Sequence, residues 1–258
     1  MATGRPRVVT SRQGGPDLGD VTGPFLLALL GGDEAAVEGL VSRSRSLGAD
    51  TALVVRDLVM PALCEVGRMW SRGEASIAEE HLATALVSRV LSRSCGGAAV
   101  SPGTARRIVF ACLAGEFHDL GIRFLADVAR ECGWDAESLG ANVPREALVC
   151  FVQQRPPAAV ALSVSLAGHV PEAARTIAEI RAVVPGITVL VGGLAFREDP
   201  ERFSLTGADV GITDAVSLRD WLRAQEKKKS GAPPNGLSAH GLPETMPASL
   251  RRRVARSR

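Results

Sequence analysis

The stretch RRIVFACLAGEFHDLG, residues 106–121, decides the fold of this chain. A run of β-branched and aliphatic residues ends at Gly115, and a short polar loop then leads into a helical pattern. Similar apolar runs return at 136–141, 158–165, 187–193 and 209–213, with segments of helical periodicity between them. Apolar strands that alternate with helices predict a doubly wound parallel sheet of flavodoxin-like (Rossmann-like) order.

A different pattern precedes this domain. From residue 24 to residue 94 the apolar residues recur at helical spacing without β-type alternation, which predicts four helices packed as a bundle. Glycines placed before Asp33 and Asp50 are typical of one helix ending and the next being capped. Ser76 and Glu79 form the capping box that would start the last helix. The sequence therefore predicts a four-helix bundle followed by an α/β domain.

The ends of the chain differ from both domains. Residues 1–21 are rich in Gly and Arg without periodicity, and we expect a disordered leader there. The bundle is assigned to 22–95 and the α/β domain to 105–225. Residues 226–258 carry eight Lys or Arg against two Glu, a net +6 in a chain of +2 overall, and are rich in Pro and Gly. We expect a basic disordered tail.

Composition excludes several classes. No long apolar run and no secretory leader pattern is present, so we expect a cytoplasmic protein with no membrane segment. The five cysteines are scattered and form no C-x-x-C pair, which argues against a disulfide framework or a zinc cluster. The basic tail lacks aromatic residues, and direct nucleic-acid binding is not expected. Common nucleotide, zinc-protease and α/β-hydrolase motifs are absent from the sequence.

The loop after residue 115 is where a ligand site is expected, because doubly wound sheets bind ligands at the carboxyl ends of their strands. Glu116 precedes His118 by two positions. A histidine that binds a metal through one ring nitrogen needs an acceptor at the other, and Glu116 could supply it. Gly121 would let a ligand approach the backbone. From spacing alone, a polar loop histidine beside a helix N-terminus is the favoured interpretation.

Three separated motifs change that weighting. Glu116-x-His118-x-x-Gly121, Ser163 and Gly192-Gly193 each follow or end a predicted strand. Together they resemble the D/E-x-H-x-x-G, S-x-L and G-G signature of base-off, His-on corrinoid proteins. One departure is Ser165, which stands where the S-x-L motif has leucine.

The resemblance implies a role for each motif. His118 would bind the cobalt of cobalamin in place of dimethylbenzimidazole, with Glu116 as its hydrogen-bond partner. The displaced nucleotide tail would run beside the sheet, where Ser163 contacts it and the two glycines make room for it. The cofactor-binding residues implied in this domain are Glu116, His118, Asp119, Gly121, Ser163, Ser165, Gly192 and Gly193.

The bundle carries a second signature, MWSRGEASIAEEHLAT, residues 69–84. Trp70 would end one helix while Glu80 and His81 lie in the first turn of the next, so that an indole and two polar groups could face one point. The alternative is a core tryptophan with a carboxylate favoured by the helix dipole. W-x9-E-H ahead of a corrinoid domain resembles the CarH and LitR family of cobalamin-binding photoreceptors, over residues 22–225. The resemblance implies that Trp70, Glu80 and His81 cover the upper face of adenosylcobalamin.

Two departures from that family shape the expected function. Its photoreceptors carry an N-terminal DNA-binding helix-turn-helix domain, which this sequence lacks, so we expect no stand-alone repressor of that design. In the best understood members a histidine follows the tryptophan and captures cobalt after photolysis, whereas here the residue is Ser71. His169 is assigned no role, because its position fits a helix N-terminus as well as a slot beside the sheet.

The resemblance implies a cobalamin-dependent light sensor in signalling or transcription regulation, rather than an enzyme. It would act through a protein partner or its own assembly. Relatives in which a linear tetrapyrrole joins cobalamin add biliverdin as a second chromophore to consider. The alternatives are a corrinoid methyl carrier of a methyltransferase, whose motif is usually D-x-H-D-I-G-K-N where this chain has Gly121-Ile122-Arg123, and a cobalamin storage or delivery protein.

Overall fold

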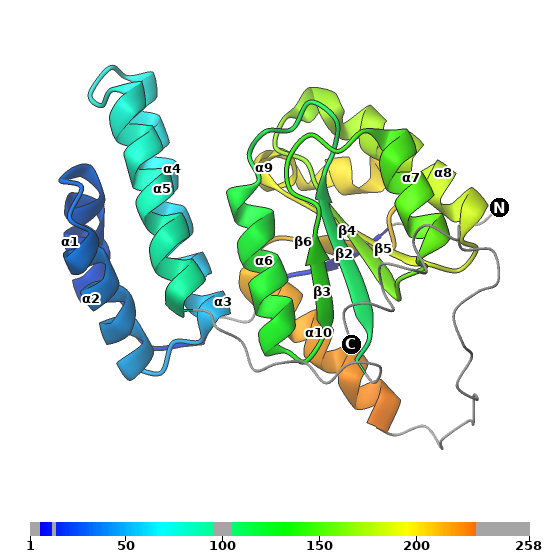
Figure 1. The fold of residues 1–258 in the computed structure, drawn as a ribbon, viewed down its shortest axis with the longest axis horizontal. Coiled ribbons are helices and arrows are strands. Elements are labelled where there is room, and N and C mark those ends of the chain that lie inside the picture. The colour runs from blue at the N-terminus through cyan, green and yellow to red at the C-terminus, as the bar shows by residue number, and fades with distance from the viewer. Residues whose placement is uncertain (1–5, 12–13, 95–104, 231–258) are drawn as a thin grey trace, which may run out of the picture. The chain divides into compact units, whose positions relative to one another are not determined.

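The computed structural model describes residues 6–11, 14–94 and 105–230, and its elements follow the predicted order (Figure 1). After a short strand near the N-terminus, four helices follow one another, as predicted. They are α1 (Gly19–Leu30), α2 (Glu34–Ser46), a continuous helix made of α3 (Thr51–Val54), the π-helical turn η1 (Val55–Val59) and α4 (Met60–Ser71), and finally α5 (Ile77–Ser94).

The helix starts are fixed by the capping residues that the sequence predicts. Asp33 and Asp50 each accept a hydrogen bond from the backbone N–H three residues on, at 2.9 and 3.1 Å. Ser76 and Glu79 cap each other: the Glu79 N–H donates to Ser76 Oγ at 3.2 Å, and the Ser76 N–H donates to Glu79 Oε2 at 2.6 Å. These bonds satisfy backbone donors that a helix start leaves open.

The second part of the chain is a six-stranded parallel sheet of order β1-β6-β5-β4-β2-β3. Its strands are β1 (Arg7–Val9), β2 (Arg107–Cys112), β3 (Asp135–Ser138), β4 (Ala159–Ser163), β5 (Thr188–Gly192) and β6 (Val210–Ile212). From β2 onward the order is the flavodoxin-like one, with the second strand outside the first. The predicted fold class is confirmed.

Helices cover both faces of the sheet (Figure 1). One face packs against α6 (Leu120–Glu131) and α10 (Ala215–Ser230), the other against α7 (Arg145–Gln154), α8 (Val170–Val183) and α9 (Leu194–Glu198). The 3-10 turns η2 (Ala167–His169) and η3 (Pro200–Leu205) complete the connections. Because side chains alternate along a strand, Ile108 and Phe110 enter one core and Val109 and Ala111 the other.

The bundle and the α/β domain share apolar contacts. The bundle core includes Phe124 of α6 and Val216 of α10. Arg219 of α10 forms an ion pair with Asp50, which also caps α3, at 2.8 Å. These contacts place the bundle and the sheet in one compact unit that ends at Gln225.

The expected disordered leader needs a correction. Arg7–Val9 forms the edge strand β1, parallel to β6, and α1 begins at Gly19. Residues 7–9 form a strand because they pair with β6, for example through the Arg7 N–H and the Asp209 carbonyl at 2.9 Å, and not because of a local sequence pattern. At the other end α10 continues to Ser230, beyond the predicted start of the tail.

Other expectations lie outside the described residues, namely the domain boundary at 95–104 and the rest of the tail, 231–258. Within the part of the chain that the structure describes, no helix is both long and apolar enough to cross a bilayer.

Candidate functional site

The carboxyl ends of the central strands lie in register. Cys112 of β2 pairs with Ser163 of β4, Ser163 pairs with Gly192 of β5, and Gly192 pairs with Ile212 of β6. Parallel strands bring these positions to one edge of the sheet. The loop that carries Glu116 and His118, the end of β4 and the two glycines after β5 therefore meet at the edge where ligands of such sheets bind.

The loop after β2 is anchored to a neighbouring loop. Gly115 has φ +83°, a conformation that favours glycine, and its N–H donates to Asn142 Oδ1 at 2.8 Å. The Asn142 N–H donates in turn to the Glu116 carbonyl, also at 2.8 Å. Beyond this anchor Phe117 is 70% exposed and the His118 side chain is exposed. His118 therefore faces solvent on a loop whose first residues are held by these two hydrogen bonds.

Glu116 is the most deeply buried acidic group of this edge, with 1% of its surface exposed. Its Oε1 accepts hydrogen bonds from the backbone N–H groups of Ser165 (2.8 Å) and Leu166 (3.0 Å) and from His169 Nδ1 (2.9 Å). Its Oε2 is buried and has no hydrogen-bond partner among the described residues. The expected bond to His118 is therefore not among the bonds that Glu116 makes in this structure.

His169 is the residue that sequence reasoning missed. It lies at the start of α8, and its Nδ1 contacts the carboxylate of Glu116. Its ring also packs against Gly115, where an added Cβ would lie 3.2 Å from Nε2. The one available signal was its position just after β4, at the same edge of the sheet as Glu116.

The glycines at this edge have two different physical roles. A Cβ on Gly193, which has φ +119°, would lie 2.3 Å from the Val164 carbonyl oxygen, and one on Gly192 would lie 2.9 Å from the Ile212 carbonyl oxygen. Close backbone packing therefore requires glycine at both positions. A Cβ on Gly121 would meet nothing within 4 Å. The protein's own packing does not require glycine there, and open space lies above the first turn of α6.

Beneath the loop, Cys112 links the strand to His118. Its Sγ lies 3.7 Å from the His118 carbonyl oxygen, to which it donates. Burial raises the pKa of the Cys112 thiol to about 12, the Asp119 carboxylate acts in the same direction, and a hydrogen bond with the Ser163 side chain partly offsets them. Cys112 is therefore a protonated thiol that helps hold the loop and Ser163 in place.

The edge also exposes apolar side chains. Phe117, Leu166 and Leu194 follow β2, β4 and β5 respectively, and each is exposed. An apolar rim with a few polar groups is typical of sites for large organic cofactors. No group of three or more His, Cys, Asp or Glu that could hold a metal was found among the described residues. A lone histidine of this kind suits a metal whose other ligands come with the cofactor.

The residues of the predicted upper face lie together at one end of the bundle. Trp70, near the end of α4, is 51% exposed and is not a core residue. Across the turn, His81 Nδ1 and Glu80 Oε2 are 2.6 Å apart, and the His81 side chain is 72% exposed. Ser71 Oγ donates to the Arg68 carbonyl of its own helix at 2.7 Å. Among the described residues, no hydrogen bond or ion pair joins this group to the strand edge.

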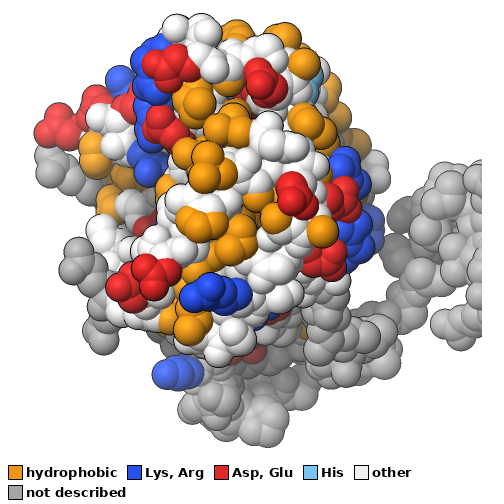
Figure 2. All heavy atoms as spheres, turned by 90° about the vertical axis from the view of Figure 1, so that its left-hand side faces the viewer, with side chains coloured by type: hydrophobic (Ala, Val, Ile, Leu, Met, Phe, Trp, Pro, Cys, Tyr) orange, Lys and Arg blue, Asp and Glu red, His pale blue; other side chains and the backbone are white. Residues whose placement is uncertain are grey.

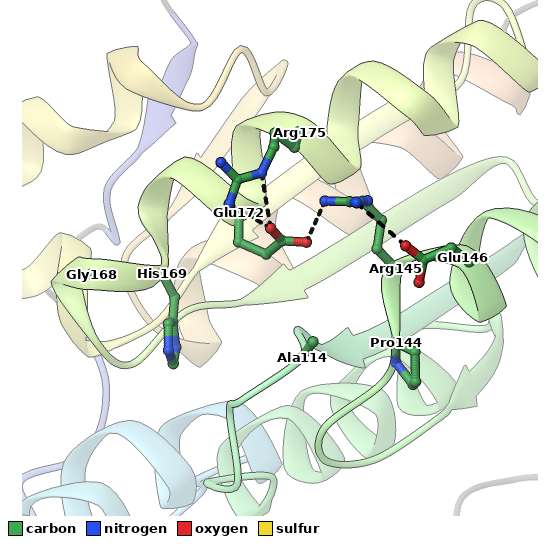
Figure 3. A pocket seen from close by; sticks show the side chains of 8 residues that line it. All are labelled: Ala114, Pro144, Arg145, Glu146, Gly168, His169, Glu172 and Arg175. Atoms are coloured by element: carbon green, nitrogen blue, oxygen red, sulfur yellow. Dashed lines mark hydrogen bonds and ion pairs between the residues drawn. The ribbon is translucent and has the colours of Figure 1, made fainter.

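A shallow pocket of about 420 Å³ lies beside the strand edge (Figure 3). Arg145 and Arg175 both pair with Glu172 there, at 2.9 and 2.7 Å. His169 also lines this pocket. Because the charges are paired with one another, the pocket has no unopposed charge to attract an ion.

Comparison with known protein families finds a match in each of the two domains. A model described as "B12 binding domain" matches residues 106–217, and a second model with the same description matches residues 24–93. The first match falls on the α/β domain and the second on the bundle. These matches coincide with the sheet that carries His118 and with the bundle that carries Trp70.

A curated relative is the "HTH-type transcriptional repressor CarH" of Myxococcus xanthus, 32% identical over 142 residues. The match covers 55% of this chain and 47% of the relative, so the chain spans about half the length of that protein. This supports the resemblance that the motifs indicated.

One solved structure shares the fold. The Methanosarcina barkeri monomethylamine corrinoid protein superposes with a TM-score of 0.65 at 13% identity, covering 81% of this chain and all of the other. A cobalamin-binding protein of Desulfitobacterium hafniense has a TM-score of 0.43 at 22% identity, with 82% and 98% covered. At such identities the first likeness shows a shared fold only.

The residues present fit a corrinoid. The buried and unpartnered Oε2 of Glu116, the open space at Gly121 and the apolar rim lie on the same edge as His118. The arrangement offers one imidazole ligand, one buried acceptor and apolar surface, which is what a cofactor with a planar macrocycle and its own metal requires.

Proposed function

We propose that this chain binds cobalamin with His118 as the lower cobalt ligand and acts as a light-dependent signalling protein. The observation that carries the proposal is the joint presence of an exposed His118 on an anchored strand-end loop and an exposed Trp70 beside Glu80 and His81 in the bundle. Each half corresponds to one of the two B12-binding family domains.

At the lower face, His118 would bind through one ring nitrogen and donate through the other. Glu116 is the nearest buried acceptor in sequence, and its Oε2 is without a partner. A ligand histidine oriented by a carboxylate has a fixed tautomer and higher basicity. Asp119 and Gly121 belong to the same loop and helix start, where the open space at Gly121 admits a ring system.

Ser163 and Ser165, at the end of β4, and the glycine pair after β5 are the proposed contacts of the nucleotide tail. The Ser165 N–H is already occupied by Glu116, so the Ser165 hydroxyl is the group left to meet a ligand. Gly192 and Gly193 keep the backbone of β5 close to its neighbours, which leaves main-chain atoms rather than side chains at that point of the edge.

At the upper face we assign Trp70, Glu80 and His81 to an adenosyl group. The indole offers a flat apolar surface, and the Glu80–His81 pair offers polar groups on the adjacent helix. When bound, adenosylcobalamin supplies a cobalt–carbon bond that light cleaves. Ser71 offers no imidazole, and its hydroxyl is engaged by its own helix. His81 is the histidine that remains near this face.

Signalling would follow from a change in which apolar side chains of the bundle are covered. Trp70, Ile77 and Leu82 are exposed apolar side chains of one helix pair, and Leu27 of α1 is 70% exposed. Figure 2 shows hydrophobic side chains gathered on the face of the molecule that lies at the left of Figure 1. Exposed apolar surface of this kind favours association, with a protein partner or a second copy. The similarity to the repressor CarH supports a role in transcription regulation.

The test uses the full chain purified with adenosylcobalamin in the dark. We expect an absorption spectrum of bound cofactor that changes under green light, together with a change in mass by size-exclusion chromatography with light scattering. The same spectra recorded with biliverdin test for a second chromophore. Trp70→Ala should weaken the response to light while leaving His118 ligation intact.

Two outcomes would contradict the proposal. Identical spectra and masses in light and dark would exclude light sensing. Turnover of a methyl donor by the loaded protein with a partner methyltransferase, without any effect of light, would place the chain among the methyl carriers instead.

A further inference from the structure

We propose that residues 7–11 and 14–18 form a strap that couples the carboxyl end of β6 to the start of α1. The strap is anchored in the sheet at one end and in the bundle at the other. A displacement at the carboxyl edge of the sheet would then reach the bundle through the backbone of one short segment.

The first anchor of the strap is the strand β1, whose three residues pair in register with the three residues of β6. The Arg7 N–H donates to the Asp209 carbonyl at 2.9 Å. Just beyond β6, Thr213 Oγ1 donates to the Val9 carbonyl at 3.3 Å. Arg7 and Val8 are exposed, so few apolar contacts add to these bonds. A short edge strand held mainly by backbone bonds to one neighbour opens easily.

The second anchor lies in the bundle. Leu18 is 4% exposed and belongs to the bundle core. The Gly19 N–H, at the start of α1, donates to Asp17 Oδ1 at 2.9 Å. Gly15 lies against the bundle as well, because an added Cβ would lie 2.9 Å from Leu53 Cδ2. The strap therefore ends in contacts that fix the first turn of α1.

The middle of the strap crosses the π-helical turn η1 without being bound to it. A pocket of about 390 Å³ separates the two, lined by Ser11, Gly14, Gly15, Pro16, Arg56 and Asp57. Arg56 pairs with Asp57 at 2.6 Å, within η1 itself. Among the described residues, no hydrogen bond or ion pair joins the middle of the strap to η1. A segment held at its two ends passes a displacement of one end on to the other.

The sheet end of the strap lies at the edge where we place the ligand. Ile212 of β6 pairs with Gly192, the last residue of β5, and an added Cβ on Gly192 would lie 2.9 Å from the Ile212 carbonyl oxygen. Close packing of this kind transmits small shifts. The residue after Ile212 is Thr213, which bonds the strap. At the other end α1 carries the exposed Leu27, so a role of the strap in signalling rests on the proposed function.

A matched pair of proline variants tests the strap in the ligand-free full chain. Backbone bonds alternate along a strand, so the Val9 N–H faces β6 as the Arg7 N–H does, whereas the Val8 N–H faces away from β6. Val9→Pro removes a donor from the pairing with β6. Val8→Pro is the control, because an edge strand accepts proline where the N–H faces solvent.

The readout is amide hydrogen exchange in α1. Val9→Pro should raise the exchange rates of the amides of residues 21–25 by up to about tenfold, the change in an opening equilibrium that one backbone hydrogen bond can cause. The first turn of α1 opens more readily once the strap is released from the sheet. Val8→Pro should leave these rates unchanged.

The coupling must also act in the opposite direction, because linkage between two equilibria is reciprocal. Leu18→Ala weakens the bundle anchor and should raise the exchange rate of the Arg7 amide in β1. Leu86→Ala is the control, because it removes the same kind of buried side chain from the same core at α5. Loss of global stability alone does not change an amide that exchanges through local opening. This second pair tests the strap even if Val9→Pro does not fold.

Three outcomes would overturn the inference. If Val9→Pro speeds exchange in β1 and β6 and leaves α1 unchanged, β1 is an edge strand without a coupling role. Equal effects of Val8→Pro and Val9→Pro on α1, or of Leu18→Ala and Leu86→Ala on the Arg7 amide, would refute the strap as well.

These measurements are independent of the proposed cofactor. Adenosylcobinamide is a cobalamin analogue without the dimethylbenzimidazole base, so a nitrogen ligand seen in its absorption spectrum has to come from the protein. Failure of the unchanged protein to give that spectrum would refute His118 as the cobalt ligand, and the exchange rates of the strap variants would still decide the coupling.

Discussion

Replacement of Glu116 should separate its two tasks, anchoring the loops and orienting His118. Glu116→Leu removes the acceptor from two backbone N–H groups and from His169 in a site where only 1% of the glutamate is exposed. Glu116→Gln keeps a carbonyl oxygen for the same three donors and places an NH₂ where the unpartnered Oε2 lies.

The size of the effect follows from those three bonds. Hydrogen bonds to a charged acceptor contribute about 1.5–3 kcal/mol each, and neutral ones about 0.5–1.5 kcal/mol. Leu166 is exposed, so its freed N–H can be hydrated, and three donors share one oxygen. We therefore expect Glu116→Leu to lower the free energy of unfolding by about 3–5 kcal/mol and Glu116→Gln by about 1 kcal/mol.

The assay is urea unfolding of the ligand-free variants, followed by circular dichroism, with the slope of the transition checked for constancy. Both substitutions should also weaken nitrogen ligation of a bound corrinoid, because neither leaves a free acceptor for His118. Unfolding free energies of both variants within about 0.5 kcal/mol of the unchanged protein, the usual range for surface substitutions, would refute the anchoring role.

Three further predictions concern stability and the upper face. Gly193→Ala should prevent folding or lower the free energy of unfolding by several kcal/mol, since its Cβ would overlap the Val164 carbonyl. Gly121→Ala should leave the free energy of unfolding unchanged or raise it by up to about 1 kcal/mol, and should weaken corrinoid binding. Equal stabilities of the two variants in urea unfolding would contradict this. Trp70→Ala should change stability by less than about 1 kcal/mol, because half of the side chain is exposed, and a larger loss in thermal unfolding would make it a core residue after all. Burial raises the pKa of the Asp127 carboxyl, so its contribution to stability is present below the pKa of the unfolded chain and is lost as the pH rises. Asp127→Asn should therefore gain stability relative to the unchanged protein between pH 4 and pH 7. Urea unfolding that shows no such gain would argue against the raised pKa.

Much of the fold could be predicted because its signals are local. Continuous apolar strands such as the one that ends at Cys112, and caps such as Asp33 and Ser76, identify themselves within a few residues. The strand β1 could not be found in this way. It has three residues, and its order depends on pairing with β6 at the far end of the chain.

The site, too, could be predicted from the sequence only in part. The rule that ligands bind at strand ends predicts His118 at the edge where β4 and β5 end, and the register of Cys112, Ser163 and Gly192 brings the three motifs to that edge. The partner of Glu116 could not be derived from sequence, because a residue two positions away and one 53 positions away compete for the same carboxylate. His169 is the residue that bonds Glu116 because the fold brings the start of α8 next to the loop after β2.

The most direct test of cobalamin binding at this edge is the absorption spectrum of adenosylcobinamide added to the unchanged protein and to His118→Ala, measured in the dark. We predict that the unchanged protein converts the probe to a nitrogen-ligated form and that His118→Ala binds it without doing so. A nitrogen-ligated spectrum that survives in His118→Ala would contradict the assignment of His118 as the cobalt ligand.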